Sequence, residues 1–425
     1  MKTFGLIGKN IGHSLSAAIH ERLYPFPYRL FDIDEIDRFM ANTDLSGVNV
    51  THPYKRRILE HCAMKDDTVE NTGAANTLVK TASGFKGFNT DFIALKHLFS
   101  TRLERSDKVA VIGGGATGAT AVAALRTLGF EGVLVYARRP VADQQPLERI
   151  HERRDITVLV NATPVGMYPD VDSEHVLDFD VFDRLRFAFD LVYAPLRTNF
   201  LIDAEAHGVS SLNGLSTLFM QALAAGAVFH GEAPREDPCT LFEDIYSNTA
   251  NIVLIGPPLV GKTHIGKALA DHFGKPFHDT DASLENTYGS DIFDLPGSPS
   301  EHVFRALENT VLRRYSEERG AVIACGGGAI LCENGIRALR RSGIIVWLDG
   351  DHRHIDADTK GKHRFLRRIE DVEKLYRERR ERYRAFADIT VQPGTSTQDT
   401  LDRIGGRLDA HIGTQRTELE SFGHS

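Results

Sequence analysis

The fold is decided by two glycine-rich stretches, each of which follows a short run of β-branched residues. They are Lys108-Val-Ala-Val-Ile-Gly-Gly-Gly-Ala-Thr-Gly118 and Asn251-Ile-Val-Leu-Ile-Gly-Pro-Pro-Leu-Val-Gly-Lys-Thr263. Both stretches predict a strand, a phosphate-binding loop and the start of a helix. Each opens a region in which apolar runs alternate with helix-like segments, a pattern typical of parallel sheets covered by helices on both faces. We therefore predict two nucleotide-binding units in tandem.

The composition is that of a globular protein of several domains. The chain has 425 residues, of which 42% are hydrophobic and 25% charged, with a net charge of −8. These values exclude a disordered chain and argue against a general nucleic-acid binder. The longest apolar runs fall far short of the ~20 residues that span a bilayer, so we expect a cytoplasmic protein with no membrane partner. Four cysteines without a CxxC pair predict reduced structural thiols.

The first glycine loop has the spacing of a dinucleotide site. Gly113, Gly115 and Gly118 allow a tight turn, a close approach to a pyrophosphate and the start of a helix. Arg138 and Arg139 end the next predicted strand, where NAD sites keep an acid, and cations there favour the 2′-phosphate of NADP. The alternative is that both arginines are merely solvated.

Four clusters of hydroxyl and amide side chains precede this loop, and one of them supplies a lysine and another an aspartate. Taken singly they predict turns and helix caps. Together with three later segments they resemble the shikimate dehydrogenase family over about residues 1–235. The clusters and segments are Gly12-His-Ser14-Leu-Ser16, Asn49-Val-Thr51-His-Pro-Tyr-Lys55, Gly73-Ala-Ala-Asn76-Thr77, Asn89-Thr-Asp91, Asn161-Ala-Thr-Pro-Val-Gly-Met167, Asp190-Leu-Val-Tyr193 and Gly214-Leu-x-x-Leu-x-x-Gln221.

The resemblance implies that NADPH reduces 3-dehydroshikimate to shikimate, with Lys55 and Asp91 as the catalytic pair. An ammonium beside a ketone can stabilise the charge that hydride transfer leaves on oxygen and can donate the proton. The residues implied for the substrate are Ser14, Ser16, Thr51, Asn76, Tyr193 and Gln221. Those implied for the cofactor are Gly113, Gly115, Ala116, Gly118, Arg138, Arg139, Thr163, Leu191 and Gly214.

The second glycine loop fits a P-loop, in which backbone amides hold phosphates, a lysine reaches the β- and γ-oxygens, and a hydroxyl ligates Mg²⁺. The residues expected to bind ATP are Gly256, Val260, Gly261, Lys262 and Thr263. Later segments in the same order resemble the shikimate kinase family over about residues 250–392. They are Asp279-Thr-Asp281, Glu301-His-Val-Phe-Arg305-Ala-Leu-Glu308, Ala324-Cys-Gly-Gly-Gly328, Arg364-Phe-Leu366 and Arg379-x-x-x-Tyr383.

The kinase resemblance implies a role for each matching residue. Thr263 and Asp279 would hold Mg²⁺, and Asp281 would bind the acceptor hydroxyl. Lys262 and a lid arginine, Arg364, would neutralise the transferring phosphoryl group. The residues implied for shikimate are Asp281, Arg305, Gly327, Gly328 and Arg379. Alternatives are that Asp279 and Asp281 cap a helix, and that Asp349, which ends a strand, is the magnesium acid.

Both halves depart from their family patterns. In the first half, Ala137 and Arg139 replace the usual asparagine and threonine, and Ala17 replaces a proline. In the kinase half the departures are Leu259 for glycine, Phe365 for proline, and Ala357 near an expected arginine. One alternative is therefore an active dehydrogenase whose kinase half serves only as a binding or scaffold module. Another is a quinate-type dehydrogenase that uses NAD.

These inferences give an α/β chain of three-layer, parallel-sheet domains. A dehydroshikimate-binding domain is expected at 1–102 plus 212–247, with a Rossmann NADP domain at 103–211 between its two parts. A P-loop kinase domain is expected at 249–412, followed by a loose tail at 413–425. The oligomeric state is left open.

Overall fold

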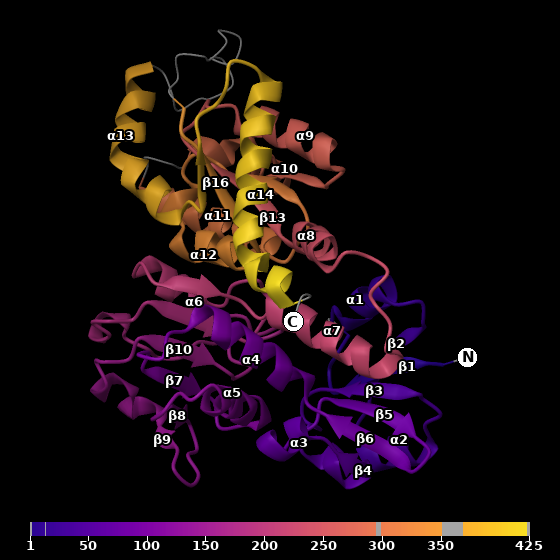
Figure 1. Ribbon diagram of the computed structural model, residues 1–425. Coiled ribbons are helices and arrows are strands. Elements are labelled where there is room, and N and C mark those ends of the chain that lie inside the picture. The colour runs from indigo at the N-terminus through magenta and orange to yellow at the C-terminus, as the bar shows by residue number, and fades with distance from the viewer. Residues whose placement is uncertain (1, 13, 295–298, 351–368, 423–425) are drawn as a thin grey trace. The chain divides into compact units, whose positions relative to one another are not determined.

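The computed structural model describes the whole chain except residues 1, 13, 295–298, 351–368 and 423–425 (Figure 1). The chain forms two compact units. Unit 1 consists of Met1–Ala194, Thr198–Glu243 and Gln415–Ser425, and unit 2 consists of Pro195–Arg197 and Asp244–Thr414. Across the described ranges, no helix is both long enough and apolar enough to cross a membrane.

Unit 1 begins with a mixed sheet whose strand order is β2-β1-β3-β5-β6-β4. Its strands are β1 (Phe4–Gly8), β2 (Tyr28–Asp32), β3 (Gly47–Val50), β4 (Cys62–Lys65), β5 (Thr77–Thr81) and β6 (Gly84–Phe88). The prediction of a parallel sheet is wrong for β5, which runs antiparallel to both β3 and β6. Because only residues 82–83 separate β5 from β6, these strands must pair as a hairpin. The nearby helices are α1 (Ser16–Leu23), α2 (Ile36–Asn42), α3 (Asp67–Thr72) and α4 (Thr90–Arg102).

The second sheet of unit 1 is parallel, in the order β12-β11-β10-β7-β8-β9. Its strands are β7 (Val109–Ile112), β8 (Leu134–Ala137), β9 (Gln145–Pro146), β10 (Val158–Asn161), β11 (Phe187–Asp190) and β12 (Ser210–Leu212). Every residue of β7, β10 and β11 is buried, as expected for central strands covered on both faces. The associated helices are α5 (Ala116–Thr127) and α6 (Asn199–Ala206). The predicted Rossmann arrangement is confirmed.

After β12 the chain returns to the first sheet through α7 (Leu215–His230). Phe229 and Ala225 of α7 are buried against Phe4, Leu6 and Tyr28 of the first sheet. This return, which the resemblance implied, brings the end of the cofactor domain back to the strands that carry the substrate motifs. The following helix is α8 (Pro238–Thr249).

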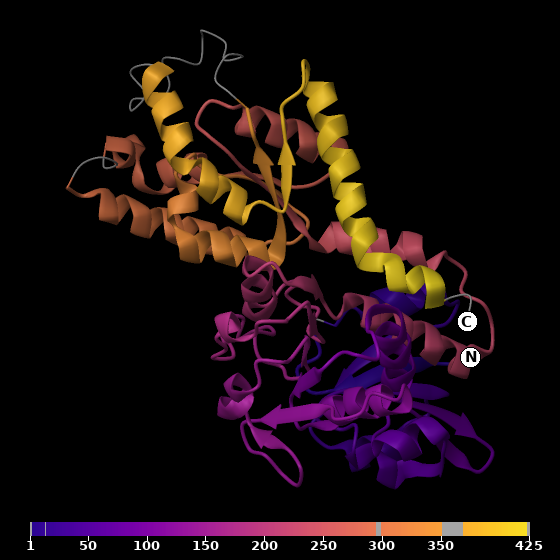
Figure 2. The same cartoon turned by 60° about the vertical axis from the view of Figure 1, so that its left-hand side comes forward.

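Unit 2 contains a parallel sheet in the order β14-β15-β13-β16-β17. Its strands are β13 (Asn251–Ile255), β14 (Phe277–Asp279), β15 (Val322–Ala324), β16 (Gly343–Leu348) and β17 (Ile389–Val391). Figure 2 shows α14 on one side of this sheet and α11, α12 and α13 on the other. On the latter side, Trp347 of β16 stacks on Tyr383 of α13, with 5.9 Å between ring centroids. The helices are α9 (Lys262–Phe273), α10 (Thr280–Tyr288), α11 (Glu301–Tyr315), α12 (Glu333–Ser342), α13 (Ile369–Phe386) and α14 (Thr397–Phe422).

The prediction of a loose tail at 413–425 is wrong, because α14 continues to Phe422. Its last part, from Gln415 onward, belongs to unit 1. The polar composition of this segment concealed an apolar position, Leu419, which is buried two helical turns after the buried Ile412.

Candidate active sites

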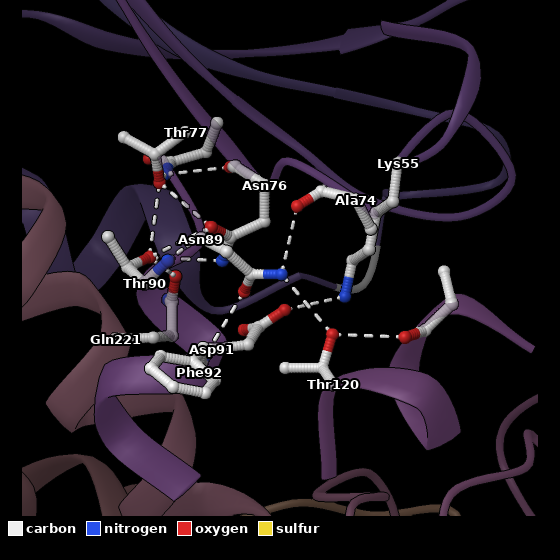
Figure 3. A network of polar contacts seen from close by, with 12 residues as sticks. Lys55, Ala74, Asn76, Thr77, Asn89, Thr90, Asp91, Phe92, Thr120 and Gln221 are labelled. Atoms are coloured by element: carbon white, nitrogen blue, oxygen red, sulfur yellow. Dashed lines mark hydrogen bonds and ion pairs between the residues drawn. The ribbon is translucent and has the colours of Figure 1, made fainter. Parts of the chain in front are cut away.

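The lysine and the aspartate predicted to act in unit 1 form an ion pair (Figure 3). Lys55 Nζ lies 2.7 Å from Asp91 Oδ2, and each side chain is 16% exposed. Lys55 lies in the loop after β3, and Asp91 lies in the first turn of α4. The pair is therefore largely shielded, yet each group can still reach a ligand from one side.

Asn89, which lies in a cluster predicted to form a turn or helix cap, holds the first turn of α4 in place. Its Oδ1 accepts a hydrogen bond from the amide of Phe92 and so caps the helix. Its Nδ2 donates to the carbonyl of Ala74 and to Thr120 of α5 (Figure 3). It also donates to the hydroxyl of Thr72. The position of an asparagine just before a predicted helix was the signal for a cap, but its bond to α5 had no sequence signal.

The predicted substrate residues Asn76 and Gln221 meet through Thr90. Asn76 Oδ1 accepts from the backbone amide of Thr90 at 2.7 Å, and the Thr90 hydroxyl donates to Gln221 Oε1 at 3.5 Å (Figure 3). Both amide side chains are buried. The structure thus joins Asn76, directly before β5, with Thr90 of α4 and Gln221 of α7 in one polar cluster beside Asp91.

The other predicted substrate residues lie in segments that follow β1, β3 and β11 of unit 1. The hydroxyls of Ser14 and Ser16 are 3.1 Å apart at the start of α1. The backbone amide of Thr51, directly after β3, donates to the carbonyl of Ile7. Tyr193 is half-buried, three residues after β11.

The first glycine loop has the backbone that a pyrophosphate requires. Gly113 has a φ of 127°, and a Cβ on Gly118 would lie 1.9 Å from the Gly113 carbonyl oxygen. Gly115 precedes the first residue of α5, Ala116, and a Cβ there would meet nothing within 4 Å. The loop is therefore closed on its protein side and open at Gly115, where a phosphate can approach the helix N-terminus.

The remaining predicted cofactor residues border this loop and the ends of β8, β10 and β11. Arg138 and Arg139 follow β8, are exposed, and form no ion pair with any described acid. A Cβ on Gly214 would lie 2.3 Å from the carbonyl oxygen of Leu191, so these two residues lie in contact. Thr163 donates to Asn161 Oδ1 at 2.7 Å.

His175 is a neighbour of this site that the sequence did not indicate. Its Nε2 lies 3.0 Å from the Thr163 hydroxyl and 3.2 Å from Asn161 Oδ1. Burial, together with the nearby charge of Arg138, lowers the pKa of His175 to about 4, so the imidazole is neutral at pH 7. No motif marked this histidine, because it lies in a loop far from the glycine spacing.

In unit 2, the P-loop lysine folds back on its own loop. Lys262 Nζ donates to the carbonyl oxygens of Gly256 and Pro257 at 2.9 and 2.8 Å. Burial lowers the pKa of Lys262 to about 8, against the opposing charge of Asp281. Gly256 and Gly261 have φ values of 151° and 93°, which suit glycine.

The predicted magnesium residues lie together. The Thr263 hydroxyl donates to Asp279 Oδ2 at 2.6 Å, while Asp279 Oδ1 caps α10 through the amide of Ala282. The capping alternative is therefore correct for Asp279, and it leaves the other oxygen aimed at Thr263. Asp349, the rival acid, instead accepts a hydrogen bond from the hydroxyl of Tyr376. A hydroxyl beside a carboxylate is a donor set that suits Mg²⁺.

The predicted shikimate residues of unit 2 converge on the glycine segment after β15. A Cβ on Gly326 would lie 2.3 Å from Asp281 Oδ1, and a Cβ on Gly328 would lie 2.5 Å from Arg305 Nη1. Arg379 Nη1 donates to the carbonyl of Gly327 at 3.1 Å. Burial raises the pKa of Asp281 to about 7, with a further contribution from the charge of Asp279.

Glu308, a residue of the kinase-like segment 301–308 for which no role was predicted, fixes the position of Arg305. Arg305 Nη1 donates to the buried Glu308 at 2.5 Å, and its Nη2 donates to Glu301 at 3.0 Å. The lid arginine Arg364 and the departures Phe365 and Ala357 lie outside the described residues.

Comparisons with known proteins fit this geometry. A shikimate dehydrogenase (NADP(+)) from Caldanaerobacter subterraneus subsp. tengcongensis is 32% identical over 261 residues, which are 54% of this chain and 92% of the relative. The chain belongs to the shikimate dehydrogenase family. The family model for the shikimate dehydrogenase substrate binding domain matches residues 6–78, and the family model for shikimate kinase matches residues 259–408.

Two solved structures resemble the shikimate dehydrogenase part of the chain. One is shikimate 5-dehydrogenase from Thermus thermophilus in complex with NADP(H) and shikimate, at 31% identity and a TM-score of 0.50, covering 57% of this chain and 97% of that one. The other is quinate dehydrogenase from Corynebacterium glutamicum in complex with NAD, at 25% identity and a TM-score of 0.51, covering 58% and 99%. The dehydrogenase and kinase domains together make this chain a bifunctional enzyme of the shikimate pathway.

Proposed function

We propose that unit 1 reduces 3-dehydroshikimate to shikimate with NADPH, and that unit 2 phosphorylates shikimate with ATP and Mg²⁺ to shikimate 3-phosphate. The observation that carries the proposal is the Lys55–Asp91 ion pair beside the cluster of Asn76, Thr90 and Gln221. A cation held next to several neutral hydrogen-bonding groups suits a substrate that has one reacting carbonyl and several hydroxyls.

In unit 1, NADPH supplies the hydride when bound. Lys55 donates a proton to the oxygen on which negative charge develops, and Asp91 aims the ammonium. Ser14 and Ser16 bind the substrate carboxylate, and Thr51, Asn76 and Gln221 bind its other oxygens, with Tyr193 beside them. The open face at Gly115 receives the pyrophosphate, and Arg138 and Arg139 bind the 2′-phosphate.

In unit 2, ATP supplies the phosphoryl group, and Mg²⁺ held by Thr263 and Asp279 offsets its charge. Asp281, with a pKa of about 7, accepts the proton of the attacking hydroxyl near neutral pH. Arg305 and Arg379 bind the carboxylate of shikimate. When ATP binds, its phosphate oxygens would replace the carbonyl oxygens of Gly256 and Pro257 as partners of the Lys262 ammonium.

Two other functions are supported by particular observations. Leu259 in the P-loop has a φ of 67°, which is unfavourable for leucine and favours the alternative in which the kinase half only binds ligands. The likeness to an NAD-bound quinate dehydrogenase favours a catabolic quinate enzyme. Arg138 and Arg139 oppose that reading, because nothing in an NAD site requires two cations at this place.

A coupled assay with the full chain tests the proposal. With 3-dehydroshikimate, NADPH, ATP and Mg²⁺ supplied, NADPH loss and ADP formation are followed separately. Lys55→Ala should abolish NADPH oxidation yet leave phosphorylation of added shikimate unchanged, and Lys262→Ala should do the reverse. Lys96→Ala and Lys267→Ala, at exposed positions on α4 and α9, are matched controls. A wild-type chain that binds shikimate but forms no ADP would establish the binding module instead.

A further inference from the structure

We infer that the last eight described residues of the chain, Gln415–Phe422, support the dehydrogenase site by holding α4 and α7, the helices that carry Asp91 and Gln221. The inference rests on the proposed function of unit 1. It assigns a role in the first activity to a segment that follows the whole kinase domain in sequence.

The contacts of this segment are polar, specific and partly buried. Glu418, whose side chain is 1% exposed, forms an ion pair with Arg102 at the C-terminal end of α4. His97 of α4 lies 3.1 Å from the carbonyl oxygen of Glu418 and 2.9 Å from the Ser421 hydroxyl. The ring of Phe422 meets the edge of the His97 ring, with 5.1 Å between centroids. A buried carboxylate with such partners indicates a specific contact, because burying a charge without a partner is costly.

The same segment reaches α7. Ser216, in the first turn of α7, donates to the carbonyl oxygen of Gln415 at 2.5 Å. Arg416 forms an ion pair of 3.2 Å with Glu243 of α8, beyond α7. Residues 415–422 are therefore attached to α4 and to Glu243 of α8 by ion pairs, and to α7 by a hydrogen bond.

Helices α4 and α7 carry the catalytic residue Asp91 and the substrate residue Gln221. Asp91 and Thr90 lie in the first turn of α4, and Gln221 lies in α7, one and a half turns after Ser216. A shift of α4 against α7 would alter the Thr90–Gln221 contact, which at 3.5 Å is already long. Because a small displacement of positioned groups costs catalysis heavily, the segment should affect substrate binding as well as stability. Glu418 is thus a positioning residue that acts through Arg102.

The test uses the full-length enzyme and three variants: a chain ending at Thr414, Glu418→Gln, and Asp409→Asn. Asp409 is exposed on the same helix, before residues 415–422, and serves as the control. Hydrogen exchange of α4 and α7 is measured by mass spectrometry, together with the KM and kcat for NADP-dependent oxidation of shikimate. ADP formation reports unit 2 in the same preparations.

In the shortened chain we expect faster exchange in Thr90–Arg102 and Leu215–His230, and a KM for shikimate at least several-fold higher, with ADP formation unchanged. Glu418→Gln should show the same pattern in weaker form, with kcat reduced less than KM is raised, while Asp409→Asn matches the wild type. Unchanged exchange and unchanged KM in the shortened chain would overturn the inference. If the wild type itself did not oxidise shikimate, the proposed function would fail, and the exchange data would still decide whether the segment holds the helices.

Discussion

Arg197 and Asp388 form a two-point ion pair inside unit 2, although 191 positions separate them in the sequence. Arg197 Nη1 and Nη2 lie 2.6 and 2.8 Å from the two carboxylate oxygens, and Asp388 is buried. Asp388 also accepts from the amide of Ile345 at the start of β16. Desolvation acts against the charge of Asp388, but Arg197 and Arg340 together keep its pKa below the ordinary value.

Replacing Arg197 by alanine should therefore destabilise unit 2 by about 3 kcal/mol, because it leaves a buried carboxylate with only the more distant Arg340. Trp347 is the only tryptophan of the chain and is buried in unit 2, so its fluorescence during urea unfolding reports this unit directly. Arg184→Ala, an exposed change in the other unit, is the control. An unchanged Trp347 transition would show that Arg340 alone compensates Asp388.

Replacing Leu259 by glycine should stabilise unit 2. The φ of 67° places leucine in the left-handed region, which costs L-residues ~1 kcal/mol or more relative to glycine. We expect the urea midpoint of the Trp347 transition to rise and the affinity for ATP to stay the same or increase. A fall in the midpoint would mean that packing by the leucine side chain outweighs the backbone strain.

Removing Arg138 and Arg139, which we propose bind the 2′-phosphate, tests the choice of dinucleotide. Arg138→Ala combined with Arg139→Ala should raise the KM for NADPH by about tenfold or more, since each charge-assisted hydrogen bond is worth roughly 1.5–3 kcal/mol. The KM for NADH should change little, because NADH lacks the 2′-phosphate. Steady-state kinetics with both cofactors measure the ratio, and an equal rise for the two would show that the arginines do not bind this phosphate.

Asn89→Ala should lower both the stability of unit 1 and its kcat, because the substitution removes four hydrogen bonds, one of which caps α4. Loss of the cap alone costs about 1 kcal/mol. Asn89→Asp keeps the accepting oxygen for Phe92 but not the donors to Thr72, Ala74 and Thr120, so it should be intermediate. The measurements are kcat and the urea midpoint for loss of NADPH oxidation, compared between the wild type and both variants. If aspartate behaved as alanine does, the contribution would come from the donors and not from the cap.

His20 should make unit 1 sensitive to acid. It is buried with both ring nitrogens unpaired, stacks on Tyr28 at 4.2 Å, and has Tyr24, Phe229 and His230 nearby. Burial lowers its pKa to about 3, with a smaller effect of His230. The unfolded chain therefore binds more protons than the folded one between pH 3 and about 6.5, and stability rises with pH across this window and is complete above it.

At pH 5 this amounts to ~2 kcal/mol relative to pH 8. His20→Phe should remove most of that difference and leave Tyr28 free to donate to Asn49 as before. The measurement is the urea midpoint for loss of NADPH oxidation, compared between pH 5 and pH 8 for both proteins. An equal pH dependence in the variant would assign the effect to other groups.

The sequence predicted best the side chains whose order and spacing match a catalytic or binding motif. Lys55 with Asp91, and Thr263 with Asp279, were expected as pairs, and the structure brings each pair within hydrogen-bond distance. Phosphate-binding loops and parallel strands could be predicted equally well, because glycine positions and apolar periodicity encode them locally.

What the sequence could not predict are contacts between residues far apart that no motif marks. Glu418 resembles any acid on a solvated helix until the helix is placed, and His175 lies in a loop without periodicity. The mixed first sheet was missed because strand direction depends on the two-residue connection at 82–83 and not on the apolar pattern. Single-sequence patterns report local geometry, whereas these features arise from the assembly of distant segments.

The division of α14 between the two units has a consequence for biosynthesis. Because unit 1 includes both the first strand and Gln415–Phe422, its last structural piece leaves the ribosome only after all of unit 2 has been translated. Domains usually fold in the order of their synthesis, yet here the dehydrogenase unit is completed only by a segment that follows unit 2 in the sequence. A chain that stopped before Gln415 would thus lack the last part of the dehydrogenase unit, so a complete dehydrogenase unit is made only after the kinase unit has been translated.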